Sequence, residues 1–286
     1  MRQYAALAAL ATTGAVLGAD RLSATEKGSL LIYSGAQGTI HISNDYPADV
    51  RLQSYIVNDA CEYYDMAFSL TANQITAFST DDLAAPFGDG GMAASVSMYV
   101  WAVYASAAAM QGNNGDAIGV AGTLNLDGVM YSSGYNGATY NFVADADALT
   151  IELLDHDFAD KNAADPNTKI VAEIWNSNEV KFSGTARCVS CIESAGLSSW
   201  SDSAVNFFRM SSLGTDLGKA RLSTEANASC GSEDNPSSER AFLASSAGFG
   251  SVAGTGMRSA TITYELESEP EEAGQRVRKA FGLLRK

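Results

Sequence analysis

The stretch that most constrains the fold is Ile170–Cys191, which the residue pattern divides into two strands and a turn. Apolar residues alternate with other residues along 170–175 and again along 179–183, with the polar turn Asn176–Asn178 between them. This period of two is typical of β-strands. The stretch ends in a pair of cysteines, Cys188 and Cys191. The sequence therefore predicts two paired strands with cysteines just beyond them.

Residues 93–110 form an uncharged run that a hydropathy scan would assign to a membrane helix. Three features favour a strand instead: alternation from Val96 to Tyr104, β-branched and aromatic residues, and glycine turns at 88–91 and 112–115. We expect a strand buried on both faces at 93–104, and the alanine-rich end beyond it stays unassigned.

Short strands separated by glycine and asparagine turns recur along the chain, at 118–153, 204–210, 218–223 and 259–266. Such spacing predicts an all-β fold made of sandwiches. A length of 286 residues leaves room for two domains, and the acidic loop 155–168 separates the halves. We expect two β-sandwich domains, Ig-like or jelly-roll-like, at residues 25–154 and 168–267.

The N-terminus has the pattern of an export signal. Arg2 precedes the uncharged apolar run 4–17, and the small residues at 16–18 suit a signal peptidase. We expect a signal peptide helix at residues 1–18, with a cut after Ala24 and an uncleaved membrane anchor as the alternatives. Cleavage would leave an exported protein, periplasmic or extracellular, with no integral membrane span.

Residues 268–286 change from acidic to basic. Val277, Phe281 and Leu284 recur at helical spacing among Lys and Arg residues. A short basic C-terminal helix is expected here, with a frayed or disordered end as the alternative. Such a helix could bind a protein or a membrane surface, so the tail is a possible site for a partner.

The formal net charge of −15 limits the possible partners. Nucleic acids and anionic lipids attract clustered Lys and Arg residues. We therefore expect no binding to nucleic acid, and the charge predicts an acidic, solvated surface.

Export determines how the cysteines are interpreted. In an oxidising compartment Cys61, Cys188, Cys191 and Cys230 are expected to form two disulfides, for which three connectivities exist. A zinc site of four thiolates is the alternative, although only one Cys-x-x-Cys motif is present. Ile192 excludes covalent haem attachment, because that motif requires histidine after the second cysteine.

Strand placement favours one pairing of the cysteines. Cys188 ends the strand pair, and Cys230 follows the candidate strand 218–223 in the same half of the chain. We predict a Cys188–Cys230 bridge, with Cys191 as the alternative partner of Cys230. Cys61 with Cys191 would complete the set across the two domains.

A run of acids in the loop between the domains is the best candidate for a metal site. Carboxylates of Asp155, Asp157 and Asp160 could bind Ca²⁺, which prefers oxygen ligands from a flexible loop. Their spacing is not that of an EF-hand, and the glycine of that loop is absent. A solvated acidic loop explains them as well, so we expect no metal and no cofactor.

Tyrosines near turns are candidates for sugar binding. Exposed aromatic rings bind the apolar face of a sugar, and Tyr131, Tyr135 and Tyr140 lie near glycine turns, while Tyr63 and Tyr64 follow Cys61. Packing in a core accounts for the same residues equally well.

The sequence shows no pattern typical of an enzyme. It holds two histidines, His41 and His156, and lacks G-x-S-x-G, H-E-x-x-H and phosphate-binding glycine motifs. A Ser–His–Asp triad assembled from distant loops would leave no signal in a chain so rich in serine. We expect no catalytic residue.

Several motifs resemble an uncharacterised family of exported bacterial proteins. They include ATEKGSLLI at 24–32, NDYP at 44–47, YIVN at 55–58 and IWNSNEVKFSG at 174–184, followed by TDLGKAR at 215–221 and SATITY at 259–264. The resemblance implies a secreted β-rich protein and carries over no functional residue.

These observations together favour an exported, non-catalytic β-sandwich protein with a structural or surface-interaction role. A secreted carbohydrate- or Ca²⁺-dependent binding module is the second hypothesis. A secreted hydrolase is the third.

Overall fold

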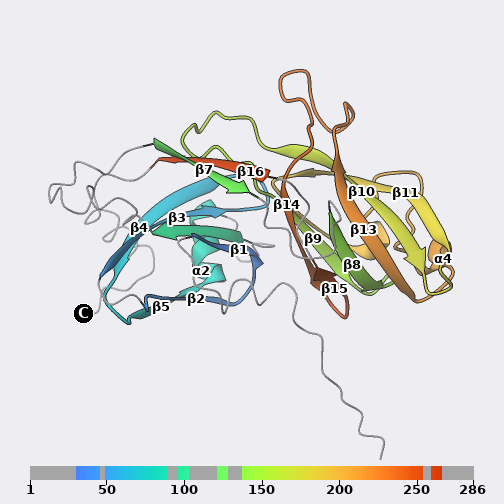
Figure 1. Ribbon diagram of the computed structural model, residues 1–286, viewed down its shortest axis with the longest axis horizontal. Helices are drawn as coiled ribbons and strands as arrows, with labels where there is room; N and C mark the ends of the chain where they lie inside the picture. Colours follow the sequence, from blue (N-terminus) through green and yellow to red (C-terminus); the bar gives the residue numbers. More distant parts are fainter. Residues whose placement is uncertain are drawn as a thin grey trace, which may run out of the picture.

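The computed structural model describes residues 30–45, 49–88, 96–102, 121–127, 137–253 and 259–265. It is an all-β protein, as predicted, with several antiparallel sheets and only short helices. The expected signal helix at 1–18 and the basic tail at 268–286 lie outside the described residues. Two bodies follow one another along the longest axis of the molecule (Figure 1).

The first body is a sandwich of a large and a small sheet. The large sheet has the strand order β1-β6-β3-β4, and the small one pairs β2 with β5. The strands span β1 (Leu30–Ala36), β2 (Thr39–Ser43), β3 (Val50–Val57), β4 (Tyr63–Leu70), β5 (Ile75–Ser79) and β6 (Val96–Ala102). The helix α2 (Thr80–Ala84) and the 3-10 turn η1 (Ala85–Phe87) follow β5, and Leu83 of α2 is fully buried in the core.

Strand β6 confirms the predicted strand over residues 96–102, and the rest of the run at 93–104 lies outside the described residues. It pairs antiparallel with both β1 and β3. Val96, Met98 and Val100 enter the core of the first sandwich, while Ser97 and Tyr99 on the opposite face are also fully buried. Burial on both faces explains why the run carries no charge. Within the described residues, no helix has the length and apolarity needed to cross a bilayer.

The second body has a five-stranded sheet with the order β11-β10-β13-β8-β15 and a three-stranded sheet with the order β12-β9-β14. The strands span β8 (Ala138–Val143), β9 (Ala148–Leu153), β10 (Asn167–Asn176), β11 (Lys181–Ser190), β12 (Ile192–Gly196), β13 (Leu217–Glu225), β14 (Phe242–Ala247) and β15 (Ser251–Ala253). The pair β10–β11 is the hairpin expected at 170–183. Trp200, Phe208 and Phe242 fill the core between the sheets, next to the 3-10 turn η3 (Leu197–Ser199) and the helix α4 (Met210–Leu213).

The sheets divide the chain differently from the expected boundaries of 25–154 and 168–267. Strands β8 and β9, expected in the first domain, pair only with strands of the second body. Strand β16 (Ser259–Glu265), expected in the second domain, pairs with β7 (Ala121–Asp127). The loop 155–166 misleads because it connects two strands that lie in opposite sheets of one sandwich, so it does not separate domains.

The two sandwiches meet in a buried apolar junction. Tyr55, Val57 and Tyr99 of the first sandwich pack against residues of the second sandwich and of β16: Leu154, Phe158, Ile192, Ala241 and Ile262. The Phe158 ring stacks on Tyr55, with centroids 4.5 Å apart, and on His156 at 5.0 Å. Hydrogen bonds of 2.7 Å from Phe158 N to Thr263 O and 2.9 Å from Thr263 N to His156 O attach β16 to this junction.

A buried carboxyl group also bridges the sandwiches. Glu152 on β9 has no exposed surface; it accepts hydrogen bonds from Ser97 Oγ at 2.7 Å and from the Tyr99 hydroxyl. Burial raises the pKa of Glu152 above its usual value, and these hydrogen bonds oppose the shift. A buried polar group costs little only when it is paired, so this network fixes how the two sandwiches are aligned.

Candidate binding surface

All four cysteines form disulfides. Cys61 is joined to Cys191 with their Cα atoms 5.5 Å apart, and Cys188 to Cys230 with 5.2 Å between Cα atoms. These are the two pairs that the sequence analysis expected. The first crosses the junction between the sandwiches, and the second ties the loop 226–240 to β11. No thiolate of this set is left for zinc, so the four-thiolate alternative is wrong.

The three aspartates considered for Ca²⁺ serve backbone groups. Asp155 accepts hydrogen bonds from Thr261 N at 2.9 Å and Ala241 N at 3.4 Å. Asp157 accepts the N–H of Asp160 and of the residue before it, while the Asp160 carboxylate caps the following turn. Among the described residues these carboxylates form no cluster that could hold one ion.

A hollow of about 60 Å³ lies beside the junction disulfide and is lined by Tyr63, His156, Asp157 and Asp165 among others. This volume admits only a few water molecules. Burial raises the pKa of Asp165, and burial together with the nearby Asp157 raises that of Tyr63. Because its volume is only about 60 Å³, the hollow is too small for a sugar or a peptide.

His156 is enclosed in the junction. Burial lowers its pKa to about 4, assisted by the charge of Arg240, while a hydrogen bond with the backbone of Leu153 opposes the shift. Tyr99 and Phe158 flank the ring. A neutral, enclosed imidazole of this kind has no access to a substrate.

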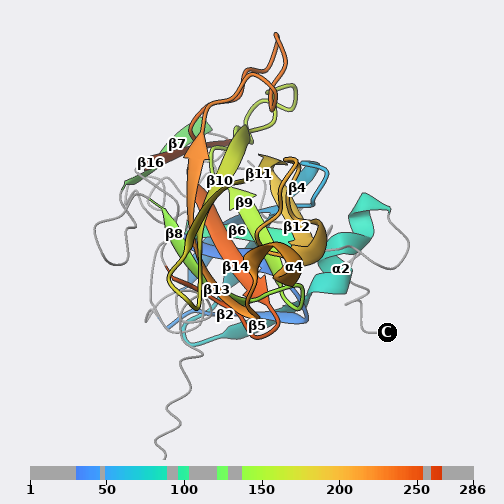
Figure 2. The ribbon, with the colours of Figure 1, turned by 90° about the vertical axis from the view of Figure 1, so that its right-hand side faces the viewer.

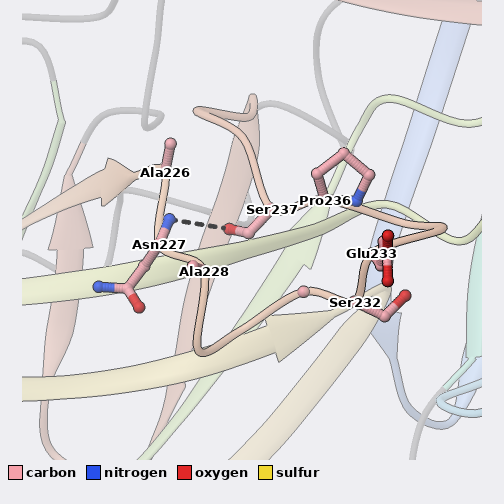
Figure 3. Close-up of a pocket in the computed structure, with 8 residues that line it drawn as sticks. Ala226, Asn227, Ala228, Ser232, Glu233, Pro236 and Ser237 are labelled. Atoms are coloured by element: carbon pink, nitrogen blue, oxygen red, sulfur yellow. Dashed lines mark hydrogen bonds between the residues drawn. The ribbon is translucent and has the colours of Figure 1, made fainter.

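A second hollow, of about 410 Å³, opens on the loop that Cys230 anchors, and Figure 3 shows its lining. Ala, Gly, Ser and Asn residues form most of it, with Glu233 and Pro236 at one side. Asn227 N donates a hydrogen bond to Ser237 Oγ at 3.3 Å and closes the loop (Figure 3). The lining has no aromatic ring on which a sugar could stack, so it does not favour carbohydrate binding.

The tyrosines considered for sugar binding serve packing where the structure describes them. Tyr140 has no exposed surface and lies in the core of the second sandwich. Tyr64 packs on the first core and donates its hydroxyl to Leu83 O at 2.8 Å. Tyr63 lies in the junction. Tyr131 and Tyr135 lie outside the described residues.

Most of the exposed hydrophobic side chains lie on a surface of the second sandwich that is here called the distal tip; its helix α4 lies at the end of the molecule away from the first sandwich (Figures 1 and 2). It comprises the β8–β9 turn at 144–147, the β10–β11 turn at 177–180, the segment 203–217 and the β14–β15 turn at 248–250. Among the described residues, six large hydrophobic side chains are exposed. One of them, Ile75, belongs to the first sandwich, and the other five all belong to the tip: Val180 (49%), Val205 (41%), Met210 (47%), Leu217 (51%) and Phe249 (87%).

A buried carboxylate presents the most exposed of these side chains. Asp147 is only 2% exposed; it accepts hydrogen bonds from Val143 N at 2.7 Å and from Phe249 N at 2.6 Å. Gly248 has a φ of 117°, and a Cβ there would lie 2.3 Å from Asp147 Oδ1. Only glycine fits that backbone, so Phe249 projects from a turn whose geometry is fixed.

Hydrogen bonds also connect the β8–β9 turn to the segment that bears Met210 and Leu217. Asp145 Oδ2 accepts the N–H of Met210 at 2.9 Å. Ala144 N donates to Asp216 O at 2.8 Å, and Leu217 pairs with Val143. The Met210 and Leu217 backbones are therefore held to the same turn.

Asn176 organises the remaining part of the tip. Its Oδ1 accepts the N–H groups of Asn178 and Val180, both at 3.0 Å. Its Nδ2 donates to Leu213 O at 3.1 Å, which ties the β10–β11 turn to α4. Val205 lies at the side of the tip, with a methyl group 3.3 Å from where a Cβ on Gly184 would be. Hydrogen bonds thus link the segments that bear Val180, Met210, Leu217 and Phe249, while Val205 lies beside Gly184 of β11.

Sequence reasoning missed this surface. Its signal is local: each apolar residue stands among turn residues, as in Asn-Glu-Val180-Lys, Arg-Met210-Ser-Ser and Gly-Phe249-Gly. A lone apolar residue in a turn is common, and only the fold shows that turns separated along the chain meet at one place.

No protein-family model matches the chain, and no curated protein matches it either. Two solved structures are similar at a TM-score of 0.18: PNGase F, a glycosylasparaginase from Flavobacterium meningosepticum, at 9% identity, and a peptide-N(4)-(N-acetyl-beta-D-glucosaminyl) asparagine amidase at 10% identity. Each alignment covers 82% of this chain and 92% of the other. A likeness of this size carries no argument about the fold or activity of this chain.

Proposed function

We propose that the chain is an exported, non-catalytic β-sandwich protein that acts by surface interaction through the distal tip. The observation that carries the proposal is that, of the six large hydrophobic side chains exposed among the described residues, five belong to the second sandwich. Apolar side chains exposed on neighbouring turns are surface that a partner can bury. The two disulfides are compatible with an oxidising compartment.

The free energy gained by burying these side chains has the size expected for a contact between two folded surfaces. Burying a large aliphatic or aromatic side chain completely is worth about 1.5–3 kcal/mol. Four of the five are near half exposure, so full burial would yield roughly 1 kcal/mol for each of these and more for Phe249. The total offsets much of the cost of association, and it is too small to hold the protein in a bilayer core.

Retention on the producing cells tests the proposal. Met210→Ser, Leu217→Ser and Phe249→Ser are combined in one variant, and the envelope-bound and released fractions of the exported chain are measured. We expect the bound fraction to fall about tenfold or more relative to the released one. Ile75→Ser is the matched control, since it removes an exposed hydrophobic side chain from the first sandwich. Equal retention of the tip variant and the control would contradict an interaction through the tip.

A further inference from the structure

We propose that Asn227 is a glycosylation site, at which a sugar is joined to the side-chain nitrogen once the chain has been exported. This inference shares with the proposed function only the export of the chain. It is drawn from the sequence around Asn227, the hydrogen bonds of its side chain and the position of the loop 226–240 in the molecule.

The full sequence contains one Asn-x-Ser/Thr motif that a glycosyl transferase can use, Asn227-Ala228-Ser229. The only other asparagine with a hydroxyl residue two positions later is Asn235, and the intervening Pro236 excludes it as an acceptor. Such a motif is typical of a surface loop in a secreted protein. Both asparagines belong to the loop 226–240, so the loop contains its own internal comparison.

Ser229 orients the side chain of Asn227. The Asn227 Oδ1 atom accepts a hydrogen bond from Ser229 N at 2.9 Å and another from the Ser229 hydroxyl. The Asn227 Nδ2 atom makes no hydrogen bond with any residue that the structure describes. Figure 3 shows the carboxamide on the side of the loop away from Glu233 and Pro236. The oxygen is thus occupied, and the nitrogen that would receive a sugar is available.

Asn235 has the opposite arrangement. Its Nδ2 donates a hydrogen bond to Asp165 O at 2.9 Å. Its backbone oxygen accepts hydrogen bonds from Asn167 Nδ2 at 3.3 Å and from Ser232 N at 2.9 Å. These contacts attach this side of the loop to the segment at the start of β10, and they engage the carboxamide nitrogen. Sequence and structure therefore both select Asn227 over Asn235.

The loop that carries Asn227 projects from the body of the molecule in two perpendicular views (orange in Figures 1 and 2). It follows β13, whose other end, at Leu217, belongs to the distal tip. The 9 residues of β13 span about 26 Å, so a sugar on Asn227 would lie away from the tip. Ala228 and Ser229 are exposed. A transferase can therefore reach the motif without disturbing either core.

The transfer requires a transferase and a sugar activated as a pyrophosphate ester. A bond forms between Asn227 Nδ2 and the anomeric carbon of the sugar, and the bond from that carbon to the phosphate oxygen breaks. The pyrophosphate leaves with the bonding electron pair, Nδ2 gives one proton to a base of the transferase, and nothing is oxidised or reduced. Glu225, two positions before Asn227, is exposed, so its carboxylate can pair with a basic side chain of the transferase.

Mass spectrometry of the exported chain tests the proposal. The full chain is purified from the envelope and the medium of the producing cells, and its intact mass and the fragment spectra of the peptide around Asn227 are recorded. We expect a sugar on Asn227 of the wild type. Asn227→Gln should lose it completely, and Asn235→Gln, the matched control, should keep it. An unmodified Asn227 in the exported wild type, or a sugar on Asn235 in its place, would overturn the proposal.

Two variants of Ser229 separate recognition of the motif from folding. Ser229→Ala removes the hydroxyl and should abolish the modification, whereas Ser229→Thr keeps a hydroxyl and should preserve it. Because this position is exposed, both variants should unfold at the same temperature. A sugar that remains on Asn227 in Ser229→Ala would contradict transfer through this motif.

The modification and the proposed function fail separately. A sugar on Asn227, in a chain whose tip variant is retained on cells as well as the Ile75→Ser control, would support this inference and overturn the proposed function. An unmodified Asn227, together with loss of retention in the tip variant, would overturn this inference and leave the proposed function in place.

Discussion

The two ends of the second sandwich are made by the same strands and have opposite surroundings. At the junction end, the residues around Leu154, Phe158 and Ile192 are buried against the first sandwich. At the distal tip, Val180, Leu217 and Phe249 are exposed. Each end carries several apolar side chains, and they differ in whether the chain supplies a cover for them.

This difference shows which end of the second sandwich contributes to the free energy of folding. The junction has a disulfide, a buried carboxyl network and a stack of aromatic rings, so its side chains contribute to the free energy of folding. The tip is held by hydrogen bonds of turn backbones, so its side chains add little to folding and remain available for binding. The following changes test this contrast, beginning with the largest expected effect.

Removing the junction disulfide should have the largest effect. Cys61→Ser with Cys191→Ser frees a segment whose ends are 130 residues apart, and the chain-entropy model predicts a loss of about 5 kcal/mol in the free energy of unfolding. Cys188→Ser with Cys230→Ser, with a separation of 42, should cost about 4 kcal/mol. Denaturant unfolding of both double variants gives the comparison. A smaller loss in the first variant would contradict the dominance of the junction.

Truncating the ring at the centre of the junction should come next. Phe158 is 4% exposed and stacks on two other rings, so Phe158→Ala should lower the free energy of unfolding by about 3–5 kcal/mol. Phe249→Ala at the tip is the matched control, and we expect it to change stability by less than about 0.5 kcal/mol. Thermal unfolding measures both. Equal losses would remove the distinction between the two ends.

Lowering the pH should reduce the free energy of unfolding through His156, which lies in the junction. Its pKa in the folded state is about 4, against an ordinary value of 6.5, so below pH 6.5 the unfolded chain binds a proton that the folded chain does not. Stability should therefore fall as the pH falls from about 6.5 to about 4, by about 3 kcal/mol in total. Burial raises the pKa values of Glu152 and Asp165, and these groups act in the opposite direction.

Comparison of the wild type with His156→Gln isolates the contribution of the histidine, because both proteins contain Glu152 and Asp165. The difference in unfolding free energy between them should vary with pH between about 4 and 6.5. Two parallel pH profiles would show that His156 is not held neutral in the folded protein.

Substitution at the tip should have the smallest effect on folding. Met210→Ser with Leu217→Ser should change the free energy of unfolding by less than about 0.5 kcal/mol, because both side chains are near half exposure. Denaturant unfolding measures the change. A loss of more than about 2 kcal/mol would place these side chains in the folding core.

The fold was readable from the sequence wherever a pattern is local. Alternation predicted β6 and its burial on both faces, and it predicted the β10–β11 hairpin, because consecutive side chains of a strand point to opposite faces. The Cys188–Cys230 pair followed from strand placement, and Cys61 with Cys191 completed the set. Local patterns did not predict to which sandwich β8 and β9 belong. Strands in either half of the chain could pair with them, and only long-range pairing selects the partners.

The candidate binding surface was harder to predict from local sequence patterns than the strands were. Asp155, Asp157 and Asp160 resemble a metal site in sequence, yet their oxygens accept backbone N–H groups in the structure. In the sequence, the exposed residues of the tip are isolated apolar residues in three separate segments, 177–180, 203–217 and 248–250. Whether a side chain in a turn is exposed depends on which element passes over it, and no local pattern contains that information.

The sequence by itself thus determined the strands, their faces and the content of the turns, since these depend on residues within one or two positions of each other. The tertiary structure decided which strands share a sheet, that Glu152 and His156 are enclosed, and that five large hydrophobic side chains of the second sandwich are exposed. These depend on contacts between residues far apart in the chain. Burial and pairing energies between distant segments select them, and the order of residues alone does not.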